Sequence, residues 1–331
     1  MKKYSLKQIE LFIHKIQQQR ILVIGDLMLD QFIWGKVNRI SPEAPVPVVH
    51  VTHESAYPGG AANVARNIAD FGGQATICGM VGSDVHGQEL LALLGQSRIN
   101  TGGVIVRNEY TTIVKTRIIA RQQQVVRVDR ESVEPLIPAM YAALPEKLEQ
   151  IIHNVDAVII EDYGKGFITQ PLVDKVTAIC RTHNKIITVD PNPGNPLQWQ
   201  GVTLVKPNRA EAYQSAGLPY NEDKQSLLQV GETLLNKWQS AGILITLGED
   251  GLMLFQPPEQ PFHTPTKARE VFDVSGAGDT VIAFYTAALA AGLTGAEAAQ
   301  VANHAAGIVV GKLGTATLTP DELLKSFQDN E

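Results

Sequence analysis

The sequence predicts an α/β protein in which a mostly parallel β-sheet is covered by helices on both faces. Short apolar runs, typical of buried strands, alternate with stretches of helical periodicity along most of the 331 residues. The composition, 44% hydrophobic and 19% charged, is sufficient for a large core. Residues 31–57 and 104–130 contain strand-like runs without helices between them. They predict a small β lobe, inserted in two pieces, within one domain that spans residues 1–331.

The expected elements follow from local periodicity. The first is an amphipathic helix, because Leu6, Ile9, Ile13 and Ile16 fall on one helical face. Branched and apolar residues predict buried strands at residues 21–26, 157–160, 186–190, 203–205 and 243–247. Helices are expected at residues 170–182 and 225–240, and this alternation favours parallel strands. Ligands are then expected at the carboxyl ends of the strands.

Composition and charge exclude several classes of function. A net charge of -6 without a basic stripe gives no reason to expect a nucleic-acid partner. No run of apolar residues reaches a membrane span, and the N-terminus lacks the apolar block of a signal peptide. Cys78 and Cys180 lie in apolar settings, as expected for reduced thiols of a cytoplasmic protein. Histidine and cysteine spacings predict no structural zinc site.

The most informative run is residues 273–280, where small residues precede a helix that begins with a carboxylate. The N–H groups of Gly276, Ala277 and Gly278 can bind an anion at the helix N-terminus. A carboxylate would repel bound phosphate, so Asp279 is interpreted as a general base that takes a proton from an attacking hydroxyl. Taken alone, the run is equally compatible with a helix cap and packing glycines. A dinucleotide fingerprint fails because Val281 replaces its third glycine, and no P-loop motif is present.

Two further segments accompany this run. In residues 58–69, Gly59 and Gly60 enter an alanine-rich helix, and residues 206–211 contain the N-x-x-E element Asn208 and Glu211. Residues three apart share a helical face, so both side chains can point to one hydrated cation. Together and in this order, the three segments resemble the signatures of the ribokinase/PfkB family of sugar kinases. The resemblance implies a ribokinase-like, doubly wound fold that uses ATP and Mg²⁺.

Residues 38–49, 116–124 and 311–315 narrow the resemblance to the heptose-7-phosphate kinase branch of this family. The branch implies ATP-dependent phosphorylation of the C1 hydroxyl of D-glycero-β-D-manno-heptose 7-phosphate, for ADP-heptose and lipopolysaccharide core synthesis. Its members are often fused to a nucleotidyltransferase, and this chain is expected to be the kinase only. Two departures weaken the assignment of the substrate. Asn192 stands where relatives carry lysine, and Phe284 replaces a small residue.

The resemblance also implies the sugar-binding residues. Asp30, which follows the first expected strand, could accept two sugar hydroxyls, and Gly59, Gly60 and Asn63 are expected to hold the sugar from another side. The phosphate of the substrate requires cations, and the small β lobe offers four of them. These four are Lys115, Arg117, Arg121 and Arg127. They could equally be solvated charges on the surface of the lobe.

On the nucleotide side, Asn208 and Glu211 are expected to serve Mg²⁺ through water. Thr246 and Gly248 should line the phosphates or ribose. The adenine is expected between Asn303 and the pair Ala306 and Gly307. The resemblance also implies a monovalent-cation site at Asp273 and Ser275, and it leaves open whether K⁺ is required.

Three functions stay in view, all with a small-molecule ligand. They are a heptose-phosphate kinase, another PfkB-type kinase of a sugar, sugar phosphate or nucleoside, and a catalytically silent sugar-binding protein. A cluster of cations in the lobe favours the first, because a neutral sugar requires none. A homodimer joined through the β lobes is also expected, because Ile113, Val125 and Val128 leave an apolar surface on a lobe too small to bury it.

Overall fold

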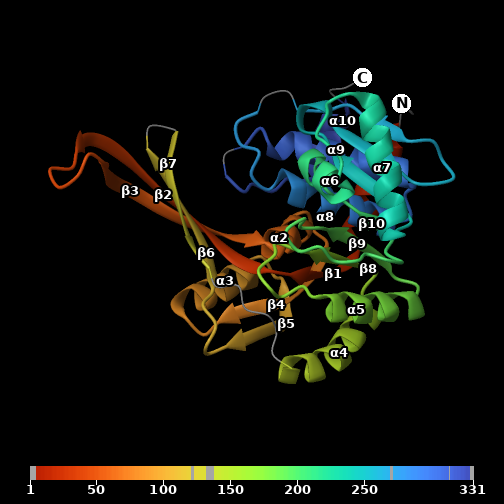
Figure 1. Ribbon diagram of the computed structural model, residues 1–331, viewed down its shortest axis with the longest axis horizontal. Coiled ribbons are helices and arrows are strands. Elements are labelled where there is room, and N and C mark those ends of the chain that lie inside the picture. Colours follow the sequence, from red (N-terminus) through yellow and green to blue (C-terminus); the bar gives the residue numbers. More distant parts are fainter. Residues whose placement is uncertain (1–4, 121–122, 132–137, 269–270, 313, 329–331) are drawn as a thin grey trace.

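The computed structural model describes residues 5–120, 123–131, 138–268, 271–312 and 314–328. It consists of a nine-stranded sheet between helices and a four-stranded sheet that projects from one side of this body (Figure 1). The α/β fold class with a small second sheet, predicted from the sequence, is confirmed.

The large sheet has the order β13-β12-β11-β10-β9-β8-β1-β4-β5, and its strands are parallel from β5 to β11. β12 pairs antiparallel with both of its neighbours, β11 and β13. The first expected strand pairs on both sides, Ile21 with Ala75 and with Ala157, and is central to the sheet. The strands are β1 (Arg20–Gly25), β4 (Gln74–Gly82), β5 (Asn100–Arg107), β8 (Ala157–Glu161), β9 (Ile186–Asp190), β10 (Leu204–Val205), β11 (Ile243–Thr246), β12 (Leu252–Phe255) and β13 (Phe262–Thr264).

Helices cover both faces of this sheet. Successive side chains of a strand point to opposite faces, so a strand of consecutive apolar residues must be covered on both. In β1, Ile21 and Val23 pack into one core cluster, whereas Leu22 and Ile24 pack into the other. The first cluster includes side chains of α1 (Leu6–Gln17), α2 (Ala61–Asp70), α3 (Val85–Gln96), α8 (Ala277–Ala290), α9 (Gly295–Val309) and α10 (Pro320–Gln328). The second includes side chains of α4 (Pro138–His153), α5 (Gln170–Thr182), α6 (Arg209–Ala216) and α7 (Lys224–Trp238).

The small sheet has the order β3-β2-β6-β7 and is made of two chain segments. Its strands are β2 (Leu27–Ile40), β3 (Pro47–Gly60), β6 (Ile113–Ala120) and β7 (Gln123–Arg130). One expected boundary is wrong: residues 104–107 belong to β5 of the large sheet, where Val104 pairs with Gly79. The apolar run there forms a parallel strand beside β4, and the small sheet resumes only at Ile113.

Ile9, Ile13 and Ile16 of α1 are buried in the core, as expected, whereas Leu6 at the start of the helix is 42% exposed. Cys78 and Cys180 are buried free thiols, and burial raises the pKa of each to about 12. Phe284 is buried and contacts Phe71 edge to face, with ring centroids 4.7 Å apart. In the described part of the chain, no helix has the length and apolar character needed to cross a membrane.

Candidate active site

Two adjoining cavities open at the carboxyl ends of β8 to β11, next to the N-terminus of α8. One has a volume of about 690 Å³ and the other about 470 Å³. Thr246, Gly248 and Gly278 line both, so the two cavities form one continuous cleft. The position agrees with the expectation that ligands bind where parallel strands end.

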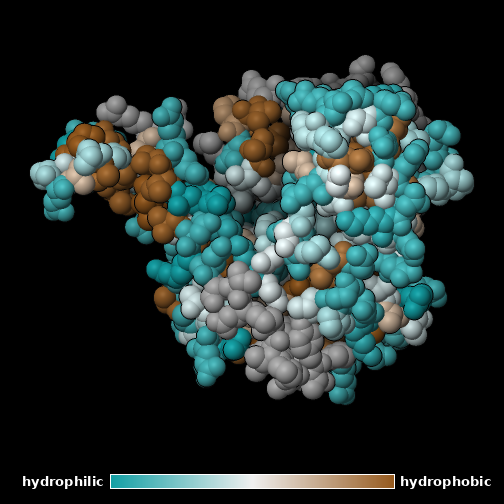
Figure 2. All heavy atoms as spheres, in the orientation of Figure 1, coloured by the Kyte–Doolittle hydropathy of each residue, from teal (hydrophilic) through white to brown (hydrophobic). Residues whose placement is uncertain are grey.

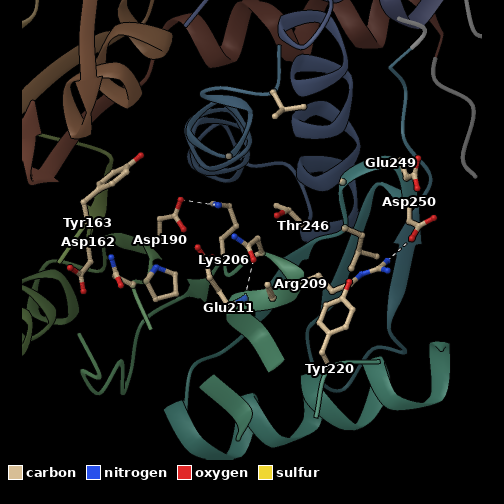
Figure 3. A pocket seen from close by; sticks show the side chains of 18 of the residues that line it. Asp162, Tyr163, Asp190, Lys206, Arg209, Glu211, Tyr220, Thr246, Glu249 and Asp250 are labelled. Carbon is tan, nitrogen blue, oxygen red and sulfur yellow. Dashed lines mark hydrogen bonds and ion pairs between the residues drawn. The ribbon is translucent and has the colours of Figure 1, made fainter. Parts of the chain in front are cut away.

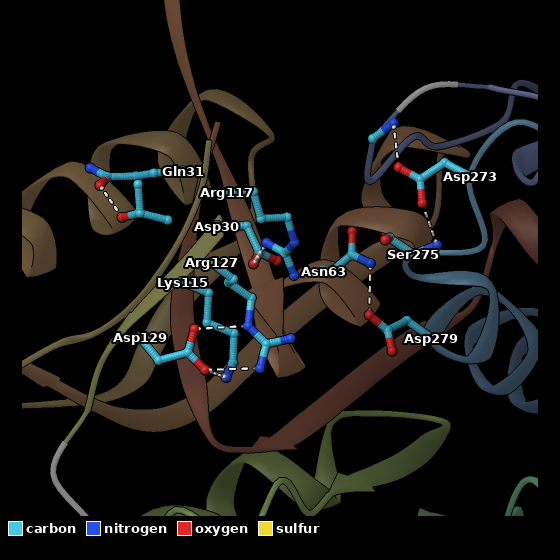
Figure 4. A network of polar contacts seen from close by, with 12 residues as sticks. Asp30, Gln31, Asn63, Lys115, Arg117, Arg127, Asp129, Asp273, Ser275 and Asp279 are labelled. Carbon is cyan, nitrogen blue, oxygen red and sulfur yellow. Dashed lines mark hydrogen bonds and ion pairs between the residues drawn. The ribbon is translucent and has the colours of Figure 1, made fainter. Parts of the chain in front are cut away.

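Asp279 lies in the first turn of α8, and two side chains from distant segments hold its carboxylate. The Asn63 amide nitrogen donates to Oδ2 over 2.7 Å, and the Tyr163 hydroxyl donates to Oδ1 over 2.8 Å. Figure 4 shows Asn63 of α2 pointing at Asp279. Only 8% of Asp279 is exposed, so its orientation is fixed by these two donors. Asn63, expected on the sugar, thus contacts the candidate base.

The environment of Asp279 raises its pKa to about 6. Burial is the main cause, because it disfavours the ionised form, and the nearby carboxylate of Asp190 acts in the same direction. The hydrogen bonds from Asn63 and Tyr163 and the positive charge of Lys206 oppose this shift. The carboxylate is therefore ionised at neutral pH, with a pKa near that of an efficient general base.

This environment predicts a pH dependence. If Asp279 accepts the proton, kcat should rise with pH through about 6 and fall about tenfold between its plateau and pH 5. Tyr163→Phe removes a donor to the ionised form, so the midpoint should move to higher pH. The matched control is Tyr285→Phe. Tyr285 is buried in α8, the helix of Asp279, and its hydroxyl has no hydrogen-bond partner among the described residues. An unshifted midpoint in Tyr163→Phe would contradict the role given to this tyrosine.

The turn before Asp279 has the backbone of an anion-binding site. Gly276 is the N-cap of α8 with φ of 78°, a conformation that favours glycine. A side chain at this position would also start 2.8 Å from the Asn63 amide nitrogen. Ala277 and Gly278 line the cleft at this helix start, where the helix dipole favours a negative charge, and the Ala277 N–H already donates to the Val274 carbonyl over 3.2 Å.

A buried charged cluster lies beside this turn. Glu161, Asp190 and Asp279 each offer a carboxylate oxygen, and these oxygens all lie within 4.8 Å of one another. Lys206 forms an ion pair with Asp190, with Nζ to Oδ2 at 2.8 Å (Figure 3). Burial, reinforced by the charges of Asp190 and Asp279, raises the pKa of Glu161 well above its usual value. Among the described residues, no group forms a hydrogen bond with its carboxyl oxygens.

Asn208 and Glu211 form a capping box at the start of α6. The Asn208 side chain accepts from the Glu211 N–H over 2.9 Å, and the Glu211 carboxylate accepts from the Asn208 N–H over 2.8 Å. Both line the larger cavity, so they lie together as expected. Each has one side-chain oxygen committed to the helix start, an arrangement that the N-x-x-E spacing also favours.

Asp273 and Ser275 are also close together, but the Asp273 carboxylate has backbone partners. It accepts from the Ser275 N–H over 2.9 Å and from the Gly314 N–H over 3.1 Å (Figure 4). These bonds tie the segment before α8 to residues 311–315, a region that the sequence singled out.

The smaller cavity contains the residues expected around the nucleotide, on both its phosphate or ribose side and its adenine side. Thr246, Gly248, Asn303, Ala306 and Gly307 all line it. Its lining also includes two apolar side chains that are far more exposed than the core: Val271 at 63% and Val274 at 68%. The Asn303 amide is committed to the fold, since it donates to Thr264 and to the carbonyl of Pro265.

On the small sheet, Asp30 is 5% exposed and forms an ion pair with Arg117 on the adjacent strand. Gly59 pairs with Met28 in the neighbouring strand, and a side chain on Gly59 would collide with the Asp30 carboxylate. Lys115 and Arg127 both contact Asp129, with nitrogen–oxygen distances of 3.3 and 2.9 Å. Figure 4 shows these cations converging on one region of the sheet. Arg121 lies outside the described residues.

Sequence reasoning missed the loop that follows β8. The Asp26 carboxylate accepts N–H groups of Tyr163, Lys165 and Phe167 over 3.0, 3.1 and 3.2 Å. This clamp presents the Tyr163 hydroxyl to Asp279. Lys165 forms a 2.7 Å ion pair with Glu131, which directly follows β7. The loop therefore links the candidate base to the small sheet.

Comparisons with known proteins identify the family of the chain. Residues 18–322 match the pfkB family carbohydrate kinase model. The chain is 43% identical over 310 residues to the bifunctional protein HldE of Desulfatibacillum aliphaticivorans and 42% identical over 312 residues to that of Geobacter sulfurreducens. Each alignment covers 94% of this chain but only 63% and 64% of the relative. The chain thus spans just under two thirds of the length of these relatives.

Solved structures show the fold. The chain superimposes on Arabidopsis thaliana ribokinase complexed with ribose and ATP with a TM-score of 0.73, at 18% identity and covering 94% and 99% of the two chains. For Escherichia coli phosphofructokinase-2 in complex with substrates and products, the TM-score is 0.75 at 19% identity, with the same coverage. The chain belongs to the pfkB family of carbohydrate kinases.

Proposed function

We propose that this carbohydrate kinase transfers the γ-phosphoryl group of ATP to the C1 hydroxyl of D-glycero-β-D-manno-heptose 7-phosphate. The observation that carries the reaction type is the buried Asp279 carboxylate, oriented by two donors beside the helix start that faces the cleft. The relatives named HldE and the similarity of residues 38–49, 116–124 and 311–315 to heptose kinases support the substrate. The product would be the 1,7-bisphosphate, made in the cytoplasm.

In this reaction Asp279 takes the proton of the anomeric hydroxyl as the new O–P bond forms. The N–H groups of Gly276, Ala277 and Gly278 stabilise the charge of the transferred group. Val271 and Val274, which line the smaller cavity together with Ala306 and Gly307, would offer apolar contact for the adenine.

The residues around the larger cavity also fit a divalent cation. Mg²⁺ prefers oxygen ligands and retains water, so its water ligands would donate to the Glu211 carboxylate at the cavity wall and to the second lone pair of Asn208 Oδ1, which already accepts from the Glu211 N–H. A bound Mg²⁺ would offset the charge of the phosphates. A monovalent cation is proposed to bind at Asp273 and Ser275, where carbonyl and carboxylate oxygens of the turn would be its ligands.

The small sheet is proposed to act as the lid over the sugar. Asp30 and the helix start at Gly59 and Gly60 would hold hydroxyls, and Arg117 would hold the substrate phosphate. Such a lid excludes water, which would otherwise compete for the γ-phosphoryl group. Lys115 and Arg127, with Arg121, complete the proposed cationic surface.

One observation favours a second candidate, a kinase of an unphosphorylated sugar. Arg117, Lys115 and Arg127 are each paired with a carboxylate of the same sheet, which satisfies their charges without a substrate phosphate. If the substrate is the heptose 7-phosphate, these cations must release their carboxylate partners and contact the substrate phosphate when it binds.

A matched pair of substrates distinguishes the candidates. Initial rates with ATP and Mg²⁺ are measured for the heptose 7-phosphate and for the heptose without its phosphate, within a panel of other sugars and sugar phosphates. We expect kcat/KM to fall by at least about 10²-fold without the phosphate, because charge-assisted contacts are lost. Equal values would contradict the proposed substrate and favour the second candidate.

We also propose a homodimer joined through the small sheets. Val125, Val126 and Val128 of β7 are 39%, 45% and 52% exposed, and Figure 2 shows hydrophobic residues gathered on the projecting lobe. Ile113 does not contribute as expected, because it is 1% exposed and packs in the core. Analytical ultracentrifugation at micromolar concentration should give about twice the 35.9 kDa chain mass. A single species at the chain mass would contradict the dimer.

A further inference from the structure

We infer that Lys206 is a phosphate-binding catalytic residue whose ammonium contacts the terminal phosphoryl group of the nucleotide. This role rests on the proposed use of ATP by the cleft, but not on the identity of the sugar. Lys206 lies directly after β10, and its side chain is buried, with 2% of the residue exposed.

The position of the ammonium is the first argument. A β-carbon built on Gly278 would lie 3.4 Å from Lys206 Nζ, so the ammonium lies beside the backbone of the anion-binding turn. Both residues line the same cavity. An anion that accepts N–H groups from this turn is therefore placed next to Nζ, and each type of donor favours the same negatively charged oxygens.

The charges around the cavity are the second argument. Its wall includes Asp162, Asp190, Glu211, Glu249 and Asp250. A nucleotide polyphosphate would be repelled by this wall without compensating cations. Among the described residues of the lining, the cations are Lys206 and Arg209, and the Arg209 guanidinium forms an ion pair with Asp250 of the same wall (Figure 3).

Lys206 also remains charged and keeps N–H donors that a phosphate can accept. Its burial would lower the pKa, but the carboxylates of Asp190, Glu161 and Glu211 outweigh this effect and raise it. An ammonium has three N–H donors, and the 2.8 Å contact with Asp190 uses one. The ion pair therefore holds Nζ at the turn while leaving donors for phosphate oxygens.

Nucleotide binding without any sugar tests this assignment. Isothermal titration calorimetry in the presence of Mg²⁺ would measure the affinities of the wild type and of Lys206→Met for three ligands. These are a non-hydrolysable β,γ-imido analogue of ATP, ADP and adenosine. We expect the variant to bind the ATP analogue about 10–100-fold more weakly, with a smaller loss for ADP and none for adenosine. Lys206→Arg should retain part of the preference for the ATP analogue. Lys237→Met controls for the loss of one charge, because Lys237 lies outside both cavities and donates to the Ser215 carbonyl.

A second variant separates ligand binding from folding. Lys206→Met leaves Asp190 without its partner, so Lys206→Met/Asp190→Asn removes both charges of the pair. The double variant should fold and still lose affinity for the ATP analogue. Wild-type affinity in the folded double variant, or equal losses for all three ligands, would overturn the inference. A failure of heptose turnover in wild type would leave these binding results unaffected.

Discussion

Asp279→Asn is expected to lower kcat by about 10²–10⁴-fold, the usual effect of removing a positioned general base. The fold should tolerate this isosteric change. Asn63, which donates to Asp279, also has an amide oxygen without a hydrogen-bond partner among the described residues. A rotated Asn63 amide can therefore accept from the new amide nitrogen, while the Tyr163 hydroxyl continues to donate.

Thermal unfolding separates chemistry from stability in this variant. Because the folded-state pKa of Asp279 is raised, its ionisation opposes folding as pH rises through about 6. Above this pH the Asn variant should consequently unfold at the wild-type temperature or higher. Asp174→Asn, an exposed aspartate on α5, is the control for loss of a carboxylate. Retention of more than about a tenth of the wild-type rate by Asp279→Asn would contradict the assignment of the base.

Asp26→Ala is expected to cause the largest loss of stability, about 3 kcal/mol, together with a lower kcat. Three backbone N–H groups of the loop after β8 donate to the Asp26 carboxylate, and all would lose their acceptor. The residue is 3% exposed, so water cannot readily replace the carboxylate. The fall in kcat would follow from displacement of Tyr163, which this loop presents to Asp279.

Urea denaturation of Asp26→Ala and Asp26→Asn measures this effect. Asparagine keeps one acceptor oxygen, so its loss should be smaller than that of alanine. Asp174→Ala should change the free energy of unfolding by no more than about 0.5 kcal/mol, as is usual for a surface site. If Asp26→Ala matches Asp174→Ala, the carboxylate does not anchor the loop.

The fold could be predicted because its strands and helices are locally encoded. Alternation in Ile21, Leu22, Val23 and Ile24 supplies both faces of β1, and α5 has the predicted bounds of Gln170–Thr182. The error at residues 104–107 has a physical reason. An apolar strand carries no signal for which of two sheets it joins, because pairing depends on distant partners such as Gly79.

Candidate site residues could be found where a motif brings special backbone geometry, as at Gly276. The contacts of Tyr163 and Lys206 could not be predicted, because each residue contacts α8 from a position more than 70 residues away in the sequence. One signal was available for the buried cluster. Three predicted strands end in, or are followed by, an acidic residue: Asp26, Glu161 and Asp190. Parallel strands bring such ends to one edge, so their proximity could have been inferred.

The most direct test of the proposed function is ³¹P NMR of the reaction of wild-type protein with ATP, Mg²⁺ and D-glycero-β-D-manno-heptose 7-phosphate. We expect a new resonance from a phosphate on the anomeric carbon, formed in equal amount with ADP and about 10²-fold more slowly or not at all with Asp279→Asn. ADP formed with inorganic phosphate alone, or phosphorylation of a hydroxyl other than that on C1, would contradict it.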